Sequence, residues 1–151
     1  MANINRFVSA EVDRIPLSDG DWIEVKKDLN TGETKRLEAC GMQAPIKLAD
    51  GTMHTPIDWE VYELERAAIF LTDWSFRNAD DKPVVLRING KVSIDALKAL
   101  DIETFNEINA GIMRHVLARA DAKKALRAAK KETTPTPQSE SESPNSDLTS
   151  T

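Results

Sequence analysis

Apolar residues are most concentrated in residues 60–76, and their spacing predicts a helix. Apolar side chains recur there at intervals of three or four residues, which places them on one helical face. They are Val61, Leu64, Ala68 and Leu71. Ile69, Phe70 and Trp74 widen this face, while charged residues (Glu63, Glu65, Arg66 and Asp73) form a polar strip. The segment is too short and too charged to cross a bilayer, so we expect a central core helix.

Two short β-prone segments precede this helix, over residues 12–17 and 22–25. They flank Asp19-Gly20, and an Asp-Gly pair between β-prone segments predicts a hairpin. Pro16 cannot donate a ladder hydrogen bond, so its strand should lie at a sheet edge. An isolated hairpin is marginal in water, so we expect Trp22 and its neighbours to pack on the central helix.

Local signals predict most of the remaining elements. Asn30 and Glu33 have the spacing of a capping box, for a helix that ends near Gly41; Thr31 with Thr34 is the alternative start. Residues 42–57 read as a loop with a short β excursion at a turn. Asp58 is a candidate cap for the central helix, with Trp59 in its first turn.

The second half of the chain predicts a further hairpin and two helices. Asn89-Gly90 separates the apolar residues Val84, Val85, Leu86 and Ile88 from Lys91-Val92, which is a hairpin signal. Ser93 is a candidate cap for a short helix. From Ile102 onward, apolar residues recur at helical spacing as far as Leu117, and strong helix formers continue to Lys131.

These elements predict a mainly α fold with a minor α+β character. We expect a small helical domain with an N-terminal β-hairpin packed on a central helix, a long C-terminal helix and a disordered tail. The predicted boundaries are a loosely ordered N-terminus (1–10), one globular domain (11–118), a projecting basic helix end (119–131) and the tail (132–151).

Charge is distributed in blocks along this acidic chain of 151 residues and net charge −5. Residues 1–113 carry 13 Lys/Arg and 20 Asp/Glu, whereas residues 114–131 carry seven and one. Residues 132–151 carry no Lys/Arg and four Asp/Glu, with many Ser, Thr and Pro. The basic block therefore needs an explanation that overall composition does not supply.

No catalytic constellation is visible in the sequence. His54 and His115 lie far apart in the chain, and Cys40 has no local signature of a nucleophile. The glycines are scattered rather than clustered as phosphate-binding loops require. We therefore expect no enzymatic activity, no cofactor and no metal site.

Five residues are candidates for partner binding: Trp59, Arg119, Lys123, Lys124 and Arg127. Tryptophan is enriched at binding hot spots, although we expect Trp22 and Trp74 to be core residues and leave Trp59 open. The basic residues could contact nucleic acid phosphates. A solvated helix end, or a contact for an acidic partner, is the favoured interpretation because no aromatic residue is interleaved.

Three segments resemble the tail assembly chaperones of long-tailed, siphovirus-type bacteriophages. They are IPLSDGDWIEVKKDLNTGETKRL (residues 15–37), DWSFRNADDKPVVL (73–86) and DIETFNEI (101–108). The resemblance covers about residues 11–110. The chain departs from the family pattern in the loop at 41–56 and in the segment at 87–91.

The resemblance implies a non-enzymatic helper that binds the long helical tape measure protein and keeps it soluble during tail assembly. Its expected partners are the tape measure protein, the tail tube protein and a second copy of itself. It implies action in the host cell cytoplasm and absence from the mature virion. A longer frameshifted product is also implied, with a slip site at Ala-Lys-Lys 122–124 or 129–131.

Two alternatives remain open from the sequence. A virion structural protein, such as a tail completion or connector subunit, would share the fold but stay in the particle. A nucleic-acid-binding regulator would use the basic helix at 114–131, and we favour it least.

Overall fold

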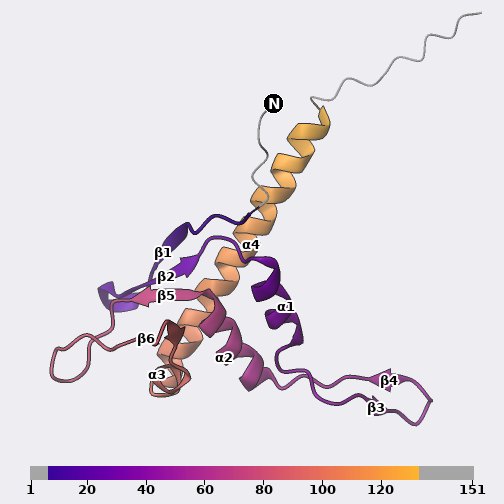
Figure 1. Ribbon diagram of the computed structural model, residues 1–151, viewed down its shortest axis with the longest axis horizontal. Coiled ribbons are helices and arrows are strands. Elements are labelled where there is room, and N and C mark those ends of the chain that lie inside the picture. The colour runs from indigo at the N-terminus through magenta and orange to yellow at the C-terminus, as the bar shows by residue number, and fades with distance from the viewer. Residues whose placement is uncertain (1–6, 133–151) are drawn as a thin grey trace, which may run out of the picture. The chain divides into compact units, whose positions relative to one another are not determined.

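A computed structural model describes residues 7–132 of the chain (Figure 1). The described residues are 48% helical and 21% strand, with a three-stranded sheet and four α-helices. The fold is therefore mixed α+β, and the prediction of a mainly α fold is wrong. The predicted disordered tail falls outside the described residues, apart from Glu132, and so do residues 1–6 of the predicted loose N-terminus.

The structure differs from the predicted fold mainly in the central apolar segment. Helix α2 (Trp59–Phe70) ends earlier than predicted, and strand β5 (Leu71–Trp74) follows it without a loop. The prediction that Asp58 caps this helix is confirmed, since its side chain accepts a hydrogen bond from the Val61 N–H at 3.2 Å. The helical period stops at Phe70 because the next residues pair with another strand.

That strand belongs to the predicted N-terminal hairpin, which is confirmed. Strands β1 (Val12–Pro16) and β2 (Trp22–Lys26) are antiparallel, and a short 3₁₀ turn (Ser18–Gly20) lies between them. The sheet order is β1-β2-β5, so Pro16 lies on an edge strand as predicted. The β2–β5 register skips Thr72, which forms a β-bulge.

Strand alternation decides which side chains enter the core. Ile23 and Val25 of β2 are fully buried, whereas Trp22 points to the other face, with the Arg14 guanidinium 3.6 Å from its ring. The prediction of Trp22 as a core residue is wrong, because the side chains of β2 that face the core are those of Ile23 and Val25. Trp74 is buried as predicted, and its indole N–H donates to the Val84 carbonyl at 2.8 Å.

The other elements follow their local signals. Helix α1 (Thr31–Ala39) begins with the predicted Asn30/Glu33 capping box, in which both hydrogen bonds are present. Two small hairpins match the predicted turns, and Asn89 and Gly90 have the positive φ that a tight hairpin turn requires. The Ser93 cap is also confirmed. The remaining elements are β3 (Ile46–Lys47), β4 (Met53–His54), β6 (Arg87–Ile88), β7 (Lys91–Val92), α3 (Ile94–Lys98) and α4 (Ile102–Glu132).

The core joins the sheet to the helices. It consists of Ile23, Val25, Ala67, Phe70, Leu71, Trp74, Leu86, Leu97, Ile108 and Ile112. Helix α4 lies against β1 and β2 over three successive turns. A side chain at Gly111 would meet Ile15 at 3.4 Å, and His115 Nε2 lies 3.1 Å from the Lys26 carbonyl oxygen. One turn further, Arg119 donates to Asp28 at 2.7 Å.

The chain divides into two units. Among the described residues, 7–119 form the first unit and 120–132 belong to the second. In the second unit the structure describes helical residues 120–132, each of which is exposed.

One buried polar contact joins α2 to α4. Arg66, predicted to lie on the polar strip of the helix, is only 9% exposed, and its guanidinium donates to Asn109 Oδ1 at 3.0 Å. A second guanidinium nitrogen lies 2.9 Å from Met113 Sδ, and the group lies near the Tyr62 ring. The ion pairs among the described residues do not include Arg66. The buried Arg66 guanidinium therefore relies on a neutral group, the Asn109 side-chain amide, as its oxygen acceptor.

We predict that Asn109→Leu lowers the free energy of unfolding by about 2–3 kcal/mol, because the buried guanidinium loses its acceptor. Arg66→Met in the Asn109→Leu background should recover most of this loss, since the pair is then replaced by apolar side chains. Urea denaturation of the single and double variants measures both effects. An unchanged unfolding midpoint for Asn109→Leu would contradict this role.

The capping-box residue Glu33 makes stability depend on pH. Burial raises the pKa of its carboxyl, but the opposing contacts together are stronger. The Lys26 ammonium, the Asn30 N–H and the charge of Arg36 hold the pKa below the ordinary value of 4.5. A pKa that is lower in the folded chain stabilises the fold above the unfolded-state pKa, and this stabilisation is lost as pH falls through the folded-state pKa.

We therefore predict that Glu33→Gln is less stable than wild type at pH 7 and loses less stability on acidification below pH 4.5. Urea denaturation of both proteins across this pH range provides the measurement. Parallel stability–pH curves for the two proteins would show that the folded and unfolded pKa values of Glu33 are equal.

Candidate functional site

An apolar groove lies between α2, α3 and the start of α4. Its volume is about 600 Å³. Its apolar lining comes from all three helices and consists of Leu64, Leu97, Leu100, Ile102 and Phe105. We refer to it as the α2–α4 groove. Leu97 is 1% exposed and forms part of the floor, whereas Ile102 is 69% exposed. An apolar groove open at the surface is the usual receptor for an amphipathic helix.

Helix caps hold the walls of the α2–α4 groove in place. Ser93 starts α3 by accepting a hydrogen bond from the Ala96 N–H. Asp101 starts α4 by accepting from the Thr104 N–H at 2.9 Å and from the Thr104 hydroxyl at 2.7 Å. These hydrogen bonds lower the pKa of Asp101, so its carboxylate stays charged at the helix N-terminus. Leu100 and Phe105 stand in the positions of a hydrophobic staple around this cap.

The charges around the α2–α4 groove are arranged unequally. Glu60 and Glu63 lie along its α2 wall, and Lys98 lies on α3. The lining thus offers apolar contact with two carboxylates and one ammonium. A helix with an apolar stripe flanked by Lys or Arg matches this arrangement in both hydrophobicity and charge.

The five predicted partner-binding residues lie elsewhere. Trp59 is 63% exposed at the start of α2, next to Glu60, and its ring meets the Tyr62 ring edge-on at 5.7 Å. Arg119 pairs with Asp28 within the first unit, and this hydrogen bond raises the Arg119 pKa. Lys123, Lys124 and Arg127 are exposed in the second unit. None of the five lines the α2–α4 groove.

Sequence reasoning did not single out the groove as a site. Helical spacing places Leu64 and Phe105 on apolar helix faces. Spacing alone does not show which part of each face the other elements leave uncovered. A usable signal is the pattern Leu100-Asp101-Ile102, in which two large apolar residues flank a helix cap. A cap residue lies at the surface, so apolar neighbours at this point indicate exposed apolar surface.

A second exposed apolar region is the arm formed by residues 42–57. It contains the β3–β4 hairpin, and every residue from Met42 to Thr55 is exposed. Its exposed large hydrophobic residues are Met42, Ile46, Leu48, Met53 and Ile57. Such a concentration of apolar side chains outside the core is typical of a contact surface for another protein.

Comparison with known proteins does not assign a family. No protein-family model, no curated protein and no solved structure matches the chain. Within residues 7–132, no group of three or more His, Cys, Asp or Glu side chains is placed to hold a metal ion. None of the helices in this range combines the length and apolar composition needed to cross a bilayer.

The floor and the edge of the α2–α4 groove should respond differently to substitution. We predict that Leu97→Ala lowers the free energy of unfolding by about 2–5 kcal/mol, because it leaves a cavity in the core. Ile102→Lys should lower it by less than about 1 kcal/mol, since the side chain is exposed and only a cation near the helix N-terminus is added. Urea denaturation tests both values. An equal loss for the two variants would mean that Ile102 is a structural residue.

Proposed function

We propose that this chain is a non-enzymatic tail assembly chaperone of a long-tailed bacteriophage. In this proposal it binds amphipathic helices of the tape measure protein and keeps that protein soluble until tail tube subunits assemble around it. The proposal includes the tail tube protein as a second partner. It places the chaperone in the host cell cytoplasm and outside the mature virion.

The α2–α4 groove is the observation that carries the proposal. It offers apolar lining residues from three helices, an exposed Ile102 and the carboxylates of Glu60 and Glu63. An apolar helix that must be kept soluble needs its apolar stripe covered, and a groove of this composition provides that cover. The net negative charge of the first 113 residues would keep coated complexes apart by repulsion.

The three segments that carry the family resemblance support the same function, because they include residues of the sheet and the helices and one of them lines the groove. The motif at 101–108 contains Phe105 of the groove, and the motif at 73–86 begins within β5. The motif at 15–37 spans most of β2 and α1. The exposed arm at 42–57, where the chain departs from the family pattern, would add a second contact surface.

Two other functions are distinguished by separate observations. A tail completion or connector subunit would be found by mass spectrometry of purified virions, whereas an assembly chaperone would be absent. A nucleic-acid-binding regulator would depend on Arg119, Lys123, Lys124 and Arg127. Arg119 is engaged with Asp28, which disfavours this third function.

The proposal is tested by co-producing the chain with the tape measure protein encoded by the same phage and measuring how much of that protein stays in solution. Wild type should keep it soluble. Ile102→Lys should reduce the soluble fraction several-fold, because a cation then repels the basic flanks of the bound helix.

Val85→Lys is the matched control. Val85 is 64% exposed, close to the 69% of Ile102, and does not line the α2–α4 groove. It should leave the soluble fraction unchanged. An insoluble tape measure protein with wild type, or equal losses with both variants, would refute the groove as its binding site.

A further inference from the structure

A second pocket lies on a different flank of α2. Its volume is about 390 Å³, and it is lined by α1, α2, the end of β2, the β6–β7 hairpin and the first residue of α3. We refer to it as the basic pocket. Its apolar lining is Ala68, Ile69, Val92 and Ile94, and its cations are Lys26, Arg36, Arg87 and Lys91. Glu33 is the one carboxylate among its lining residues. The basic pocket shares no lining residue with the α2–α4 groove.

This concentration of cations is unexpected in an acidic unit. Residues 1–113 carry 20 Asp/Glu against 13 Lys/Arg, yet four of those cations, from three separate parts of the chain, surround one pocket. The end of α2 explains part of the arrangement, because its last carbonyl groups carry partial negative charge. It does not explain all four side chains.

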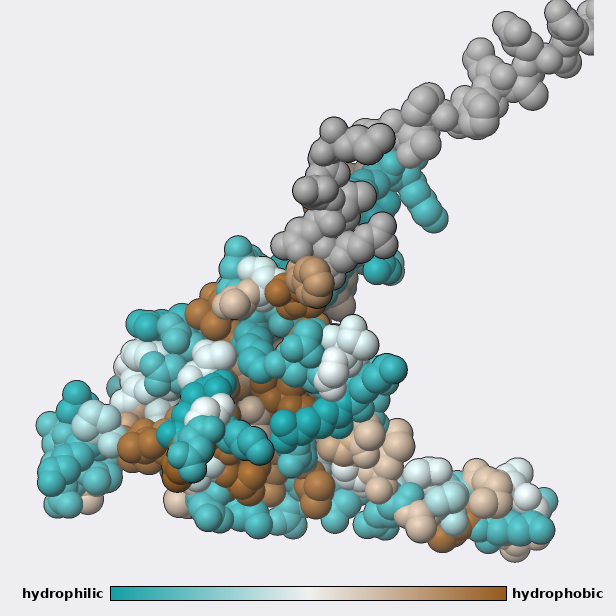
Figure 2. All heavy atoms as spheres, in the orientation of Figure 1, coloured by the Kyte–Doolittle hydropathy of each residue, from teal (hydrophilic) through white to brown (hydrophobic). Residues whose placement is uncertain are grey.

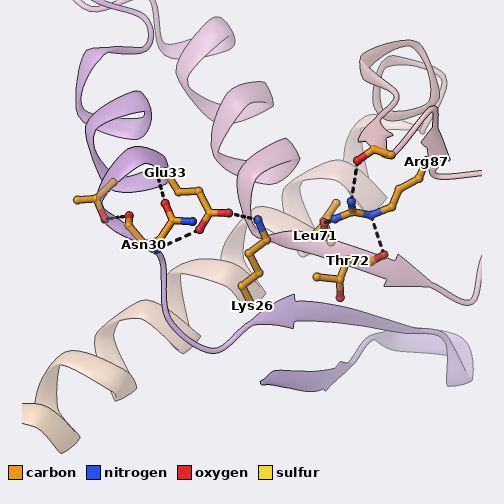
Figure 3. A network of polar contacts seen from close by, with 8 residues as sticks. Lys26, Asn30, Glu33, Leu71, Thr72 and Arg87 are labelled. Carbon is orange, nitrogen blue, oxygen red and sulfur yellow. Dashed lines mark hydrogen bonds and ion pairs between the residues drawn. The ribbon is translucent and has the colours of Figure 1, made fainter. Parts of the chain in front are cut away.

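Two of the cations form ion pairs with carboxylates of the same chain. Figure 3 shows Lys26 paired with Glu33, which also closes the capping box with Asn30. Arg36 is paired with Glu65 at 2.6 Å. These two charges are therefore balanced by carboxylates and have structural roles.

The other two cations have no such balance. Arg87 donates to the carbonyl oxygens of Leu71 and Thr72, both at 3.2 Å, and to that of Gly90 at 3.0 Å (Figure 3). Carbonyl groups satisfy its donors but leave its full charge in place. Lys91 is exposed, and neither Lys91 nor Arg87 belongs to any ion pair among the described residues.

We infer that the basic pocket binds an acidic, apolar segment of a partner protein. A carboxylate of that segment lies near Lys91 and Arg87, and an adjacent apolar side chain lies on Ala68 and Val92. The lining combines apolar and cationic side chains, which fits a ligand of mixed character. Figure 2 shows that brown apolar and teal polar side chains lie next to one another on the face in view. Charge complementarity at such a site mainly sets specificity and the rate of association.

A protein segment fits this pocket better than a nucleic acid does. The lining contains no aromatic side chain on which a base could stack. A long polyanion would also be repelled by the excess of carboxylates in residues 1–113, whereas a short acidic segment meets only the local positive charge. The inference does not depend on the proposed function, because it concerns separate residues and a ligand of opposite charge.

The test is an NMR titration of the ¹⁵N-labelled full chain with four probes. They are the peptide acetyl-Leu-Glu-Ile-Glu-Leu-amide, its counterpart with Lys in place of Glu, inorganic phosphate, and a short thymidine oligonucleotide. The Glu peptide should shift the amide signals of Lys91, Val92 and Ile94. The other three probes should leave these signals in place.

Charge reversal at the pocket supplies the second arm of the test. Lys91→Glu should weaken binding of the Glu peptide about tenfold or more, and Lys91→Gln should weaken it less. Lys35→Glu is the matched control, because Lys35 is an exposed α1 residue outside the lining. It should weaken binding much less than Lys91→Glu does, since dissolved salt screens an exposed charge that does not line the pocket.

Several results would overturn the inference. They are the absence of shifts with the Glu peptide, equal weakening by Lys91→Glu and Lys35→Glu, and stronger binding of phosphate or the oligonucleotide at the same amides. Preserved signal dispersion in each variant verifies folding. The solubility test with Ile102→Lys concerns the α2–α4 groove alone, so either idea can fail while the other stands.

Discussion

The direct passage from α2 into β5 is the constraint on which the rest of the fold depends. One buried segment supplies both the central helix and the third strand of the sheet, with Phe70 and Leu71 as adjacent core residues. Since no loop separates them, the direction of the helix and the position of the strand are set together. Strand β2 then has a partner on each side, and its ladder groups are satisfied. The exposed edge of β5 is covered by Arg87, whose guanidinium takes the place of a neighbouring strand.

Helix α4 completes the arrangement by lying along β1 and β2. Gly111 permits a close approach to Ile15, and His115 and Arg119 make polar contacts on the next two turns. On the side toward α2, the Arg66–Asn109 contact sets how the two helices face each other. A buried cation with a neutral acceptor contributes little net stability, but it penalises other packing arrangements. These contacts bring the start of α4 beside α2 and α3, and the α2–α4 groove results.

The two pockets beside α2 have opposite chemistry. The α2–α4 groove has carboxylates from Glu60 and Glu63, whereas the basic pocket has unbalanced cations at Arg87 and Lys91. A protein that works by surface contact would gain specificity from this difference, because each pocket rejects the ligand of the other by repulsion. Under the proposed function, the α2–α4 groove would hold the tape measure protein, and the basic pocket would be left for an acidic partner segment.

The sequence by itself determined the local features of this protein, because each depends on a few neighbouring residues. The Asn30 capping box, the Asp58 and Ser93 caps and the hairpin turns are of this kind. Tertiary structure decided the features that depend on distant partners. Residues 71–74 have a helical apolar spacing but form a strand, because the open edge of β2 offers ladder hydrogen bonds. Arg66 is buried because α4 supplies an acceptor, and Trp22 lies outside the core because the register of β2 directs its neighbours inward. Neither pocket could be predicted, since each forms where elements far apart in the chain leave apolar and charged side chains uncovered.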